Sequence, residues 1–397
     1  MAVPLDFPVY DADNHFYETT ESFTRYLPKK YEGAIRYVDI EGRTKIAVRN
    51  KISDYIPNPT FEVVAAPGAW EGYYRGTNTD GKTLREITGK PIRCPDAFRN
   101  PEKRLALLDE QGIHATLLFP TLASLLEERL KDDIELTHEV IHAFNRWILD
   151  EWSFNVGDRI IPTPVITLPD VAKAVAELEW CLEHGAKTVL VRPAPVPMAN
   201  GHSLSPGLPQ FDPFWSAVEQ AGIPVMLHAS DSGYDRYCSD WEGGRDEYLP
   251  FKPAAFRLVI SPGRPIFDTL AALIAHGMFT RHPGVRVAAV ENGATWVRPL
   301  VEALDIAHHK MPQEFAEHPV ETLRRHVWIH PFYEENIKDF ISVIGEDRVI
   351  FGSDFPHPEG LGDPISYAND LEGLSDVQVR KIMSDNLKDL LVTKPAA

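Results

Sequence analysis

Short apolar runs alternate with helix-length amphipathic segments along most of the chain. Near-continuous apolar runs between helices indicate a parallel sheet covered on both faces. The pattern predicts eight strands: a run ending at His15, then 114–119, 160–167, 187–192, 223–228, 285–290, 326–330 and 348–354. It predicts helices over 99–111, 134–151, 169–184, 212–221, 264–281, 293–310 and 334–344, and a last helical region over 361–392, in two pieces. Eight such units predict an α/β fold of the (β/α)8 barrel type.

An open doubly wound sheet is the main alternative to a barrel. That fold carries a glycine-rich phosphate loop after its first strand. Here the first strand leads into Asp13-Asn-His-Phe-Tyr-Glu18, which contains no glycine. The sequence therefore favours the closed barrel.

Residues 16–97 break the strand–helix rhythm. They are rich in Tyr, Gly, Pro and Asn and contain two alternating patches, at 35–40 and 44–48, which are typical of a β-hairpin. We expect the barrel to comprise 1–15 and 98–397, with 16–97 inserted after the first strand to cover the barrel mouth. Loops at that face carry function, so the insertion is a candidate lid or dimer contact.

Charge and cysteine content narrow the class of protein. The 397 residues carry a formal net charge of -18, which argues against nucleic acid or an anionic membrane surface as a partner. Cys94, Cys181 and Cys238 are isolated, as in a reducing cytoplasm, and form no thiolate zinc motif. No signal peptide is evident, and no uninterrupted apolar run approaches the roughly 18 residues of a membrane span. A small-molecule substrate is expected.

Three predicted strands end on residue types that bind metals. Asp13 and His15 follow the first strand, His228 ends the fifth and Asp354 ends the eighth. Residues two apart on a strand share a face, and the carboxyl ends of barrel strands meet at one rim. Taken alone, each is more typical of a hydrogen-bonded loop histidine or a turn carboxylate. Together they predict a divalent cation held by two imidazoles and two carboxylates, a set that suits Zn, Mn or Fe(II).

Other polar residues follow strand ends and are candidates for binding substrate. Arg192 ends the fourth strand and either clamps a substrate carboxylate or pairs with an acid of the barrel. His202 lies in the next loop and His330 ends the seventh strand. His357 is a candidate for orienting a ligand carboxylate, and Glu18 for approaching the metal.

The chain resembles the amidohydrolase superfamily, in particular the amidohydrolase-2 branch that includes ACMS decarboxylase and γ-resorcylate decarboxylase. The phrases that carry the resemblance are Asp11-Ala-Asp-Asn-His15, Arg104-Leu-Ala-Leu-Leu-Asp-Glu-Gln-Gly112, Phe211-Asp-Pro-Phe-Trp215, Leu227-His228 and Gly352-Ser-Asp-Phe-Pro-His357. The resemblance implies that Asp13, His15, His228 and Asp354 are the metal ligands, and that Asp354 also contacts metal-bound water or substrate.

Two departures from the family pattern matter. Many relatives carry His-Gly-Gly after the sixth strand, whereas this chain has Glu291-Asn-Gly293. Glu291 is then the proton-transfer group, a ligand of a second metal, or a carboxylate that supports its neighbours. Arg192 stands where hydantoinase-like relatives place a metal-bridging lysine, which argues against a lysine-bridged pair of metals.

These features predict a metal-dependent enzyme that decarboxylates or hydrolyses a small carboxylated or amide-containing substrate, aromatic in many relatives. Asp354 and Glu291 are the expected catalytic residues. One divalent metal is expected, with Zn as the first choice, Mn or Fe as alternatives and a second ion left open. Self-association into a homodimer or higher oligomer is the default for this branch. Two other hypotheses remain: an iron-dependent oxygenase on the same barrel, and a non-catalytic subunit that stabilises a partner.

Overall fold

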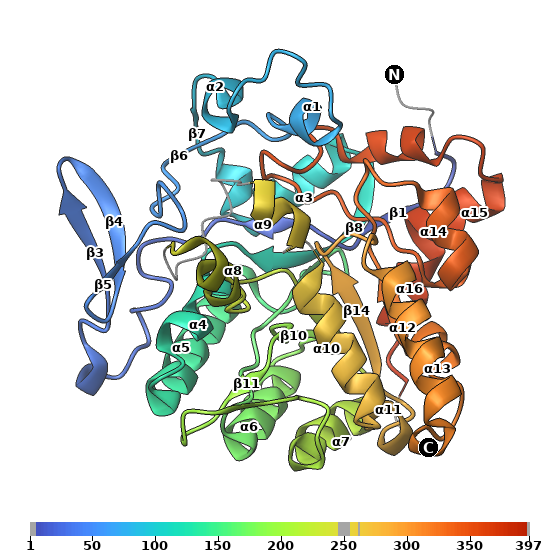
Figure 1. Ribbon diagram of the computed structural model, residues 1–397. Coiled ribbons are helices and arrows are strands. Elements are labelled where there is room, and N and C mark those ends of the chain that lie inside the picture. The colour runs from blue at the N-terminus through green and yellow to red at the C-terminus, as the bar shows by residue number, and fades with distance from the viewer. Residues whose placement is uncertain (1–4, 245–254, 261–262, 395–397) are drawn as a thin grey trace.

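The computed structural model describes residues 5–244, 255–260 and 263–394. Parallel strands form two sheets (Figure 1). In the first, a long central strand is flanked by the N-terminal strands and by the strand that follows it. The strands are β1 (Val9–Asp11), β2 (His15–Phe16), β8 (Ile113–Pro120) and β9 (Ile160–Pro162) in the first sheet, and β10 (Val189–Leu190), β13 (Pro224–His228), β14 (Arg286–Val290) and β15 (Val327–Ile329) in the second.

Single parallel bridges join these sheets into a ring. Val165 pairs with Leu190, and Ile329 pairs with Val349. The ring closes where the backbone N–H of Ala12 donates to the carbonyl of Phe351 at 2.8 Å. The predicted (β/α)8 barrel is thus confirmed.

The eighth barrel position differs from its prediction. We expected a strand over 348–354, but the segment begins in a 3-10 turn, Glu346–Arg348, and then makes isolated bridges. Asp354 has a φ of 55°, in the left-handed region that a strand does not use. The chain therefore leaves the extended conformation at the residue that faces the site.

Helices surround the strands, as the apolar periodicity predicted (Figure 1). The predicted helices appear as α3 (Pro101–Glu110), α5 (Ile134–Trp152), α6 (Val171–Glu183), α7 (Asp212–Ala221), α10 (Arg264–Ala275), α11 (Met278–Arg281), α12 (Val297–Lys310) and α14 (Ile337–Ile344). Among the described residues outside 16–97, four more α-helices were not predicted: α4 (Leu126–Leu130), α8 (Asp235–Glu242), α9 (Ala255–Ile260) and α13 (Pro319–His326). The C-terminal region contains α15 (Asp376–Arg380) and α16 (Asn386–Leu391), separated by a π-turn.

Helix α5 shows how the sequence produces a barrel helix. The Asp133 side chain accepts a hydrogen bond from the N–H of Leu136 and so caps the first turn. One stripe of the helix is buried, and its Trp147 packs 5.8 Å, centroid to centroid, from Phe16 of β2. This contact fixes the strand end that carries His15.

The insertion forms small elements of its own. They are β3 (Ile35–Ile40), β4 (Arg43–Val48), β5 (Lys51–Ser53), β6 (Val63–Val64), β7 (Ile92–Arg93), α1 (Glu71–Tyr74) and α2 (Leu84–Thr88). The predicted hairpin is present as β3 and β4, and the three-stranded sheet β3–β5 projects from the side of the molecule (Figure 1). Farther along, the N–H of Trp70 donates to the carbonyl of Pro358 at 2.7 Å. This part of the insertion therefore lies on the loop that follows Asp354.

One apolar stretch has the length of a membrane span, although charged residues interrupt it. By length and composition alone, Ala255–Ala275 is long and apolar enough to cross a membrane. Within it, however, Ile266, Leu270 and Leu273 of α10 are buried in the protein core. Core helices commonly have this composition, so the stretch is weak evidence for a membrane span.

Candidate metal centre

Asp13 lies in the turn between β1 and β2 and His15 begins β2, and Asp11 holds that turn in place. The Asp11 carboxylate accepts hydrogen bonds from the backbone N–H of Asp13 at 3.0 Å and from the Ser353 hydroxyl at 2.6 Å. It also accepts from the side-chain amide of Asn14 at 3.1 Å. Asp11 thereby fastens the end of the first strand to the eighth barrel position.

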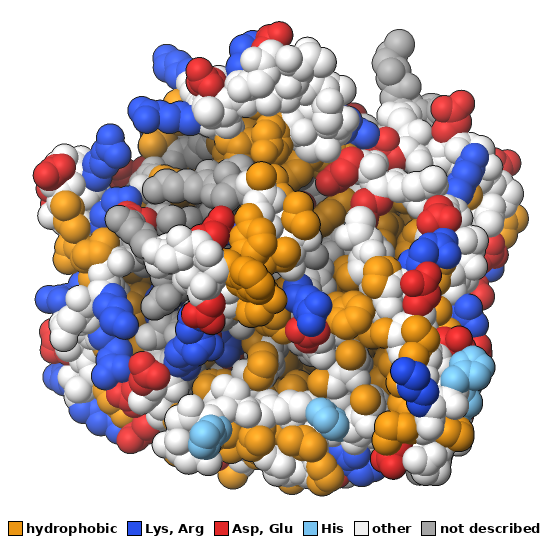
Figure 2. Space-filling view, in the orientation of Figure 1, with side chains coloured by type: hydrophobic (Ala, Val, Ile, Leu, Met, Phe, Trp, Pro, Cys, Tyr) orange, Lys and Arg blue, Asp and Glu red, His pale blue; other side chains and the backbone are white. Residues whose placement is uncertain are grey.

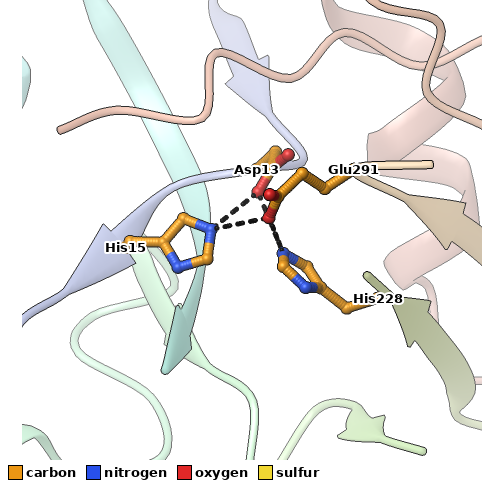
Figure 3. Close-up of side chains that lie close together, drawn as sticks. All are labelled: Asp13, His15, His228 and Glu291. Atoms are coloured by element: carbon orange, nitrogen blue, oxygen red, sulfur yellow. Dashed lines mark hydrogen bonds and ion pairs between the residues drawn. The ribbon is translucent and has the colours of Figure 1, made fainter. Parts of the chain in front are cut away.

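Four side chains from three barrel strands converge on one point (Figure 3). Nε2 of His228 lies 2.9 Å from Oε2 of Glu291 and 3.4 Å from Oδ1 of Asp13. Nε2 of His15 lies 3.3 Å from the same Asp13 oxygen and 3.4 Å from the same Glu291 oxygen. One potential ligand atom from each residue lies within 4.8 Å of all the others. Two nitrogens and two carboxylate oxygens thus surround a space the size of an ion.

In both histidines, the hydrogen bond of Nδ1 determines whether Nε2, which faces the cluster, carries a proton. Nδ1 of His15 lies 3.2 Å from the carbonyl of Pro120, and Nδ1 of His228 lies 2.8 Å from the carbonyl of Ala229. A carbonyl only accepts, so each Nδ1 carries a proton, and a neutral ring then has its lone pair on Nε2, facing the cluster. Among the described residues, the buried Nε2 of His15 and Oδ2 of Asp13 have no hydrogen-bond partner. These residues fit a divalent cation.

Charges in the cluster are strongly coupled. Burial opposes the charged form of His228, but the carboxylates of Glu291 and Asp13 outweigh it and raise the pKa of His228 to about 10. Burial likewise opposes ionisation of Glu291, yet His228 and His15 lower its pKa to about 2. Without a cation, a proton on His228 offsets one of the two carboxylate charges. A cation is the natural replacement for that proton.

Asp354 lies on the edge of this cluster. Its Oδ1 is 3.4 Å from Nε2 of His15, and it belongs to a second group of potential ligands with His15, Glu291 and His357. The predicted ligand set of Asp13, His15, His228 and Asp354 stays a prediction; the structure sets Glu291 beside the first three, with Asp354 adjacent. The sequence had placed Glu291 in a catalytic or second-metal role.

A chain of hydrogen bonds runs from Asp354 away from the cluster. Nδ1 of His357 lies 2.7 Å from Oδ1 of Asp354, and its Nε2 lies 3.0 Å from the hydroxyl of Thr121. That hydroxyl donates to the carbonyl of Phe16, so it accepts from His357 Nε2–H. Nδ1 of a neutral His357 is then an acceptor, and Asp354 holds the shared proton. The pKa values agree, because burial raises that of Asp354 well above its usual range and lowers that of His357.

Two carboxylates of the site have strained backbones. The φ angles of Glu291 and Asp354 are 54° and 55°, in the left-handed region that non-glycine residues seldom adopt. Such strain costs on the order of 1–3 kcal/mol per residue and is found mainly at functional sites. Here it aims two side chains into the barrel mouth from the ends of the sixth and eighth positions.

The three residues predicted to bind substrate lie in different settings. His330 is buried and contacts the candidate metal cluster: its Nδ1 is 3.3 Å from Oδ2 of Asp13 and accepts from the backbone N–H of Glu291 at 3.3 Å. Arg192 pairs with Glu128 at 3.0 Å, the ion-pair alternative left open by the sequence. His202 is exposed in the hairpin of β11 (Val196–Pro197) and β12 (Ser203–Leu204), and it joins neither group of potential ligands among the described residues.

One acidic residue near the cluster was not singled out from the sequence. Burial, and then the charge of Glu291, raise the pKa of Glu359 to about 8, and its buried Oε2 has no hydrogen-bond partner among the described residues. Glu18 was considered as a metal-approaching group, but its Oε1 accepts from the N–H groups of Thr121, Leu122 and Ala123. Glu359 could have been found from the sequence only by its position, two residues after His357 in the same loop.

Comparison with known proteins identifies the family. The profile of a family described as amidohydrolase matches residues 10–391. The structure of an amidohydrolase from Mycobacterium avium subsp. paratuberculosis is 41% identical, with a TM-score of 0.92, and the match covers 98% of this chain and 100% of that one. The chain belongs to the amidohydrolase family. A comparison with curated proteins finds no match.

More distant structures share the fold of this amidohydrolase. One is a dihydroxybenzoic acid decarboxylase from Polaromonas sp. JS666, solved with bound manganese and the inhibitor 2-nitroresorcinol. It is 16% identical with a TM-score of 0.61, and the match covers 97% of this chain and 96% of that one. The structure of 5-carboxyvanillate decarboxylase from Sphingomonas paucimobilis is 18% identical with a TM-score of 0.57. That match covers 74% of this chain and 83% of that one.

Family membership confirms the predicted type of enzyme. The amidohydrolase is a metal-dependent hydrolase or decarboxylase and a soluble protein, as expected from the sequence. The two alternatives, an iron-dependent oxygenase and a non-catalytic subunit, are not favoured by these comparisons.

Proposed function

We propose that this amidohydrolase catalyses the nonoxidative decarboxylation of a small aromatic acid that carries an oxygen substituent next to the carboxylate. The observation that supports this most is the 2.7 Å contact between Oδ1 of Asp354 and Nδ1 of His357, a pair that can share a proton at the edge of the cation cluster. Decarboxylation needs a proton donor at the carbon that loses CO2. The solved structures of similar fold include decarboxylases of such acids.

Asp13, His15, His228 and Glu291 would hold one divalent cation, Zn first among the candidates, with Mn and Fe as alternatives. When bound, the cation supplies a Lewis acid that binds and polarises substrate oxygens. Asp354 also remains a candidate ligand, since its Oδ1 is 3.4 Å from His15. Its proposed main task is proton transfer.

The reaction balances without an oxidant. The bond between the ring carbon and the carboxylate breaks, its electron pair stays on the ring carbon and CO2 leaves. Asp354 then gives its proton to that carbon, and solvent restores the proton. His357, held by Thr121, keeps the Asp354 carboxyl oriented during both steps.

The surroundings of the site support further proposals. The insertion, at Gly68 and Trp70, donates backbone hydrogen bonds to His357 and Pro358, so 16–97 is proposed to act as the cover of the mouth. A cytoplasmic location and a homodimer or higher oligomer remain predictions. Light scattering of the purified protein tests the oligomer.

The test is decarboxylation in D2O. Enzyme loaded with Zn or Mn is incubated with 2,6-dihydroxybenzoate and with 5-carboxyvanillate as probes, and CO2 and the phenol are measured. We expect equimolar CO2 and phenol, one deuterium at the vacated carbon and no oxygen uptake. Failure to release CO2 from any ortho-oxygenated aromatic acid, together with metal-dependent cleavage of amide probes, would establish hydrolysis instead.

A further inference from the structure

A cavity of about 270 Å³ lies among the segments that follow β8, β10 and β13 and gathers basic side chains. Its described lining combines three cations with two carboxylates, two serines and two tyrosines. The charged members are Lys131, Arg192, Arg236, Glu128 and Asp240. Figure 2 shows basic side chains gathered on this face between α4 and α8. An excess of positive charge here is notable in a chain whose formal net charge is -18.

The sheet register places this cavity next to a proposed metal ligand. Leu190 of β10 pairs with Met226 of β13, and the N–H of Val191 donates to the carbonyl of Met226 at 2.9 Å. Arg192 follows Leu190 by two residues and His228 follows Met226 by two residues, so both lie just past this pairing, toward the carboxyl rim of the barrel. Paired strands lie about 4.8 Å apart, so the two segments leave the sheet from neighbouring points of that rim. The cavity and the cation cluster therefore share one rim of the barrel.

The cations of the cavity converge on a single carboxylate. Nη1 of Arg192 lies 3.0 Å from Oε2 of Glu128, Lys131 contacts Oε1 of Glu128, and Nη2 of Arg236 lies 3.8 Å from that oxygen. Three cationic groups carry more N–H donors than one carboxylate has lone pairs. Donors remain for a second anion that enters the cavity.

Arg192 is held firmly and Arg236 is not. The side chain of Arg192 is buried, and its Nη1 also donates to the carbonyl of Asp231 at 3.0 Å. The side chain of Arg236 is 60% exposed on α8. The buried guanidinium of Arg192 and the more exposed cations of Lys131 and Arg236 form an arrangement that can hold a carboxylate from more than one side.

We infer that this cavity binds a second acidic group of the substrate, a carboxylate carried on the ring or on a short side chain away from the reacting end. The inference rests on the proposed function, because it assumes that the ring is held at the cation cluster. The substrate would then be an aromatic diacid. Lys131, Arg192 and Arg236 would distinguish it from the matching monoacid.

A matched pair of nitrophenols tests the inference without turnover. 4-Hydroxy-3-nitrophenylacetate and 4-methyl-2-nitrophenol share one ring and differ only by the remote carboxylate; the nitro group stands in for the carboxylate that would be lost. Binding to the metal-loaded enzyme is followed by the absorbance of the nitrophenol. We expect the acid to bind at least about tenfold more tightly, as a charge-assisted contact allows.

Variants expected to change the preference for the acid in opposite directions distinguish a loss of carboxylate binding from a general loss of folding. Lys131→Gln with Arg236→Gln should abolish the preference for the acid, whereas Glu128→Gln, which removes the competing carboxylate, should increase it. Arg298→Gln, at an exposed arginine of α12 outside the cavity, is the control and should leave the preference unchanged. Equal binding of the two probes by the unaltered enzyme, or the same preference in all variants, would overturn the inference. Failure of the proposed function would appear separately, as absence of CO2 release with probe binding intact.

Discussion

Gly352 and Asp13 meet at the wall between the eighth and first barrel positions. A Cβ atom built on Gly352 would lie 2.6 Å from the Cβ of Asp13 and 2.6 Å from Cε1 of His330. Real Cβ atoms do not approach so closely, and both neighbours are buried. The positions of Asp13 and His330 in the candidate metal cluster therefore depend on the absence of a side chain at residue 352.

Gly352→Ala should weaken both the fold and metal binding. The added methyl must displace Asp13 or His330, and overpacking of this kind costs about 1–3 kcal/mol. We expect a lower denaturation midpoint in urea and substoichiometric metal by elemental analysis. Gly244→Ala is the control, because its nearest described neighbour is the flexible end of Arg257 at 3.5 Å. Full metal content and unchanged stability in Gly352→Ala would contradict the role given to this contact.

Asp354→Asn should separate catalysis from metal binding. The amide keeps the size of the side chain but cannot deliver an acid proton, so turnover should fall by about 10²–10⁴-fold. Metal content should stay near that of the unaltered enzyme, whereas His228→Ala should lose the metal as well as activity. Parallel elemental analysis and CO2 release distinguish the two variants. An active Asp354→Asn enzyme would remove Asp354 as the proton donor.

Metal affinity should rise with pH. In the metal-free protein the carboxylates of Glu291 and Asp13 raise the pKa of His228 to about 10, so His228 is protonated at neutral pH. A cation must displace that proton, and its apparent affinity should increase about tenfold per pH unit between roughly pH 6.5 and 9. Competition with a chelator at several pH values measures the slope. A flat profile would show that His228 is not a ligand.

The same shift predicts how the metal-free protein responds to pH. The folded pKa of His228 lies above its ordinary value, so its stabilising contribution is complete below about pH 6.5 and is lost as pH rises through about 10. Metal-free protein should therefore melt at progressively lower temperature across that range. Metal-loaded protein should not show this dependence, since the cation replaces the proton. Differential scanning calorimetry of the two forms provides the comparison.

Arg104→Leu should destabilise the fold strongly. The fully buried Arg104 donates to the carbonyls of His15 and Ala97, each at 2.7 Å, and contacts Oδ1 of Asn14. Its loss leaves those acceptors buried without a donor, at a cost of about 1–3 kcal/mol for each. Arg298→Gln, which removes an exposed ion pair with Asp339, should cost less than about 1 kcal/mol. Urea denaturation measures both, and similar values would refute the distinction.

The sequence alone determined the barrel and much of its rim. Apolar runs of strand length separated by amphipathic helices can bury both faces of their sheet in few ways, and β13 and β14 appear where that pattern placed them. The placement of Asp13, His15 and His228 near one another followed because parallel strands bring their carboxyl ends to one rim. Local pattern is sufficient for both conclusions.

Only the tertiary structure decided which side chains meet. Glu291 joins Asp13, His15 and His228 because its left-handed backbone turns the carboxylate inward, which no spacing along the chain reveals. Asp354 leaves its strand for the same reason and meets His357 at the edge of the cluster. Arg192 forms its ion pair with Glu128, which lies 64 positions away in the sequence. Such contacts depend on loop conformation and on packing between distant segments, whereas hydrophobic periodicity reports only the local environment of each residue.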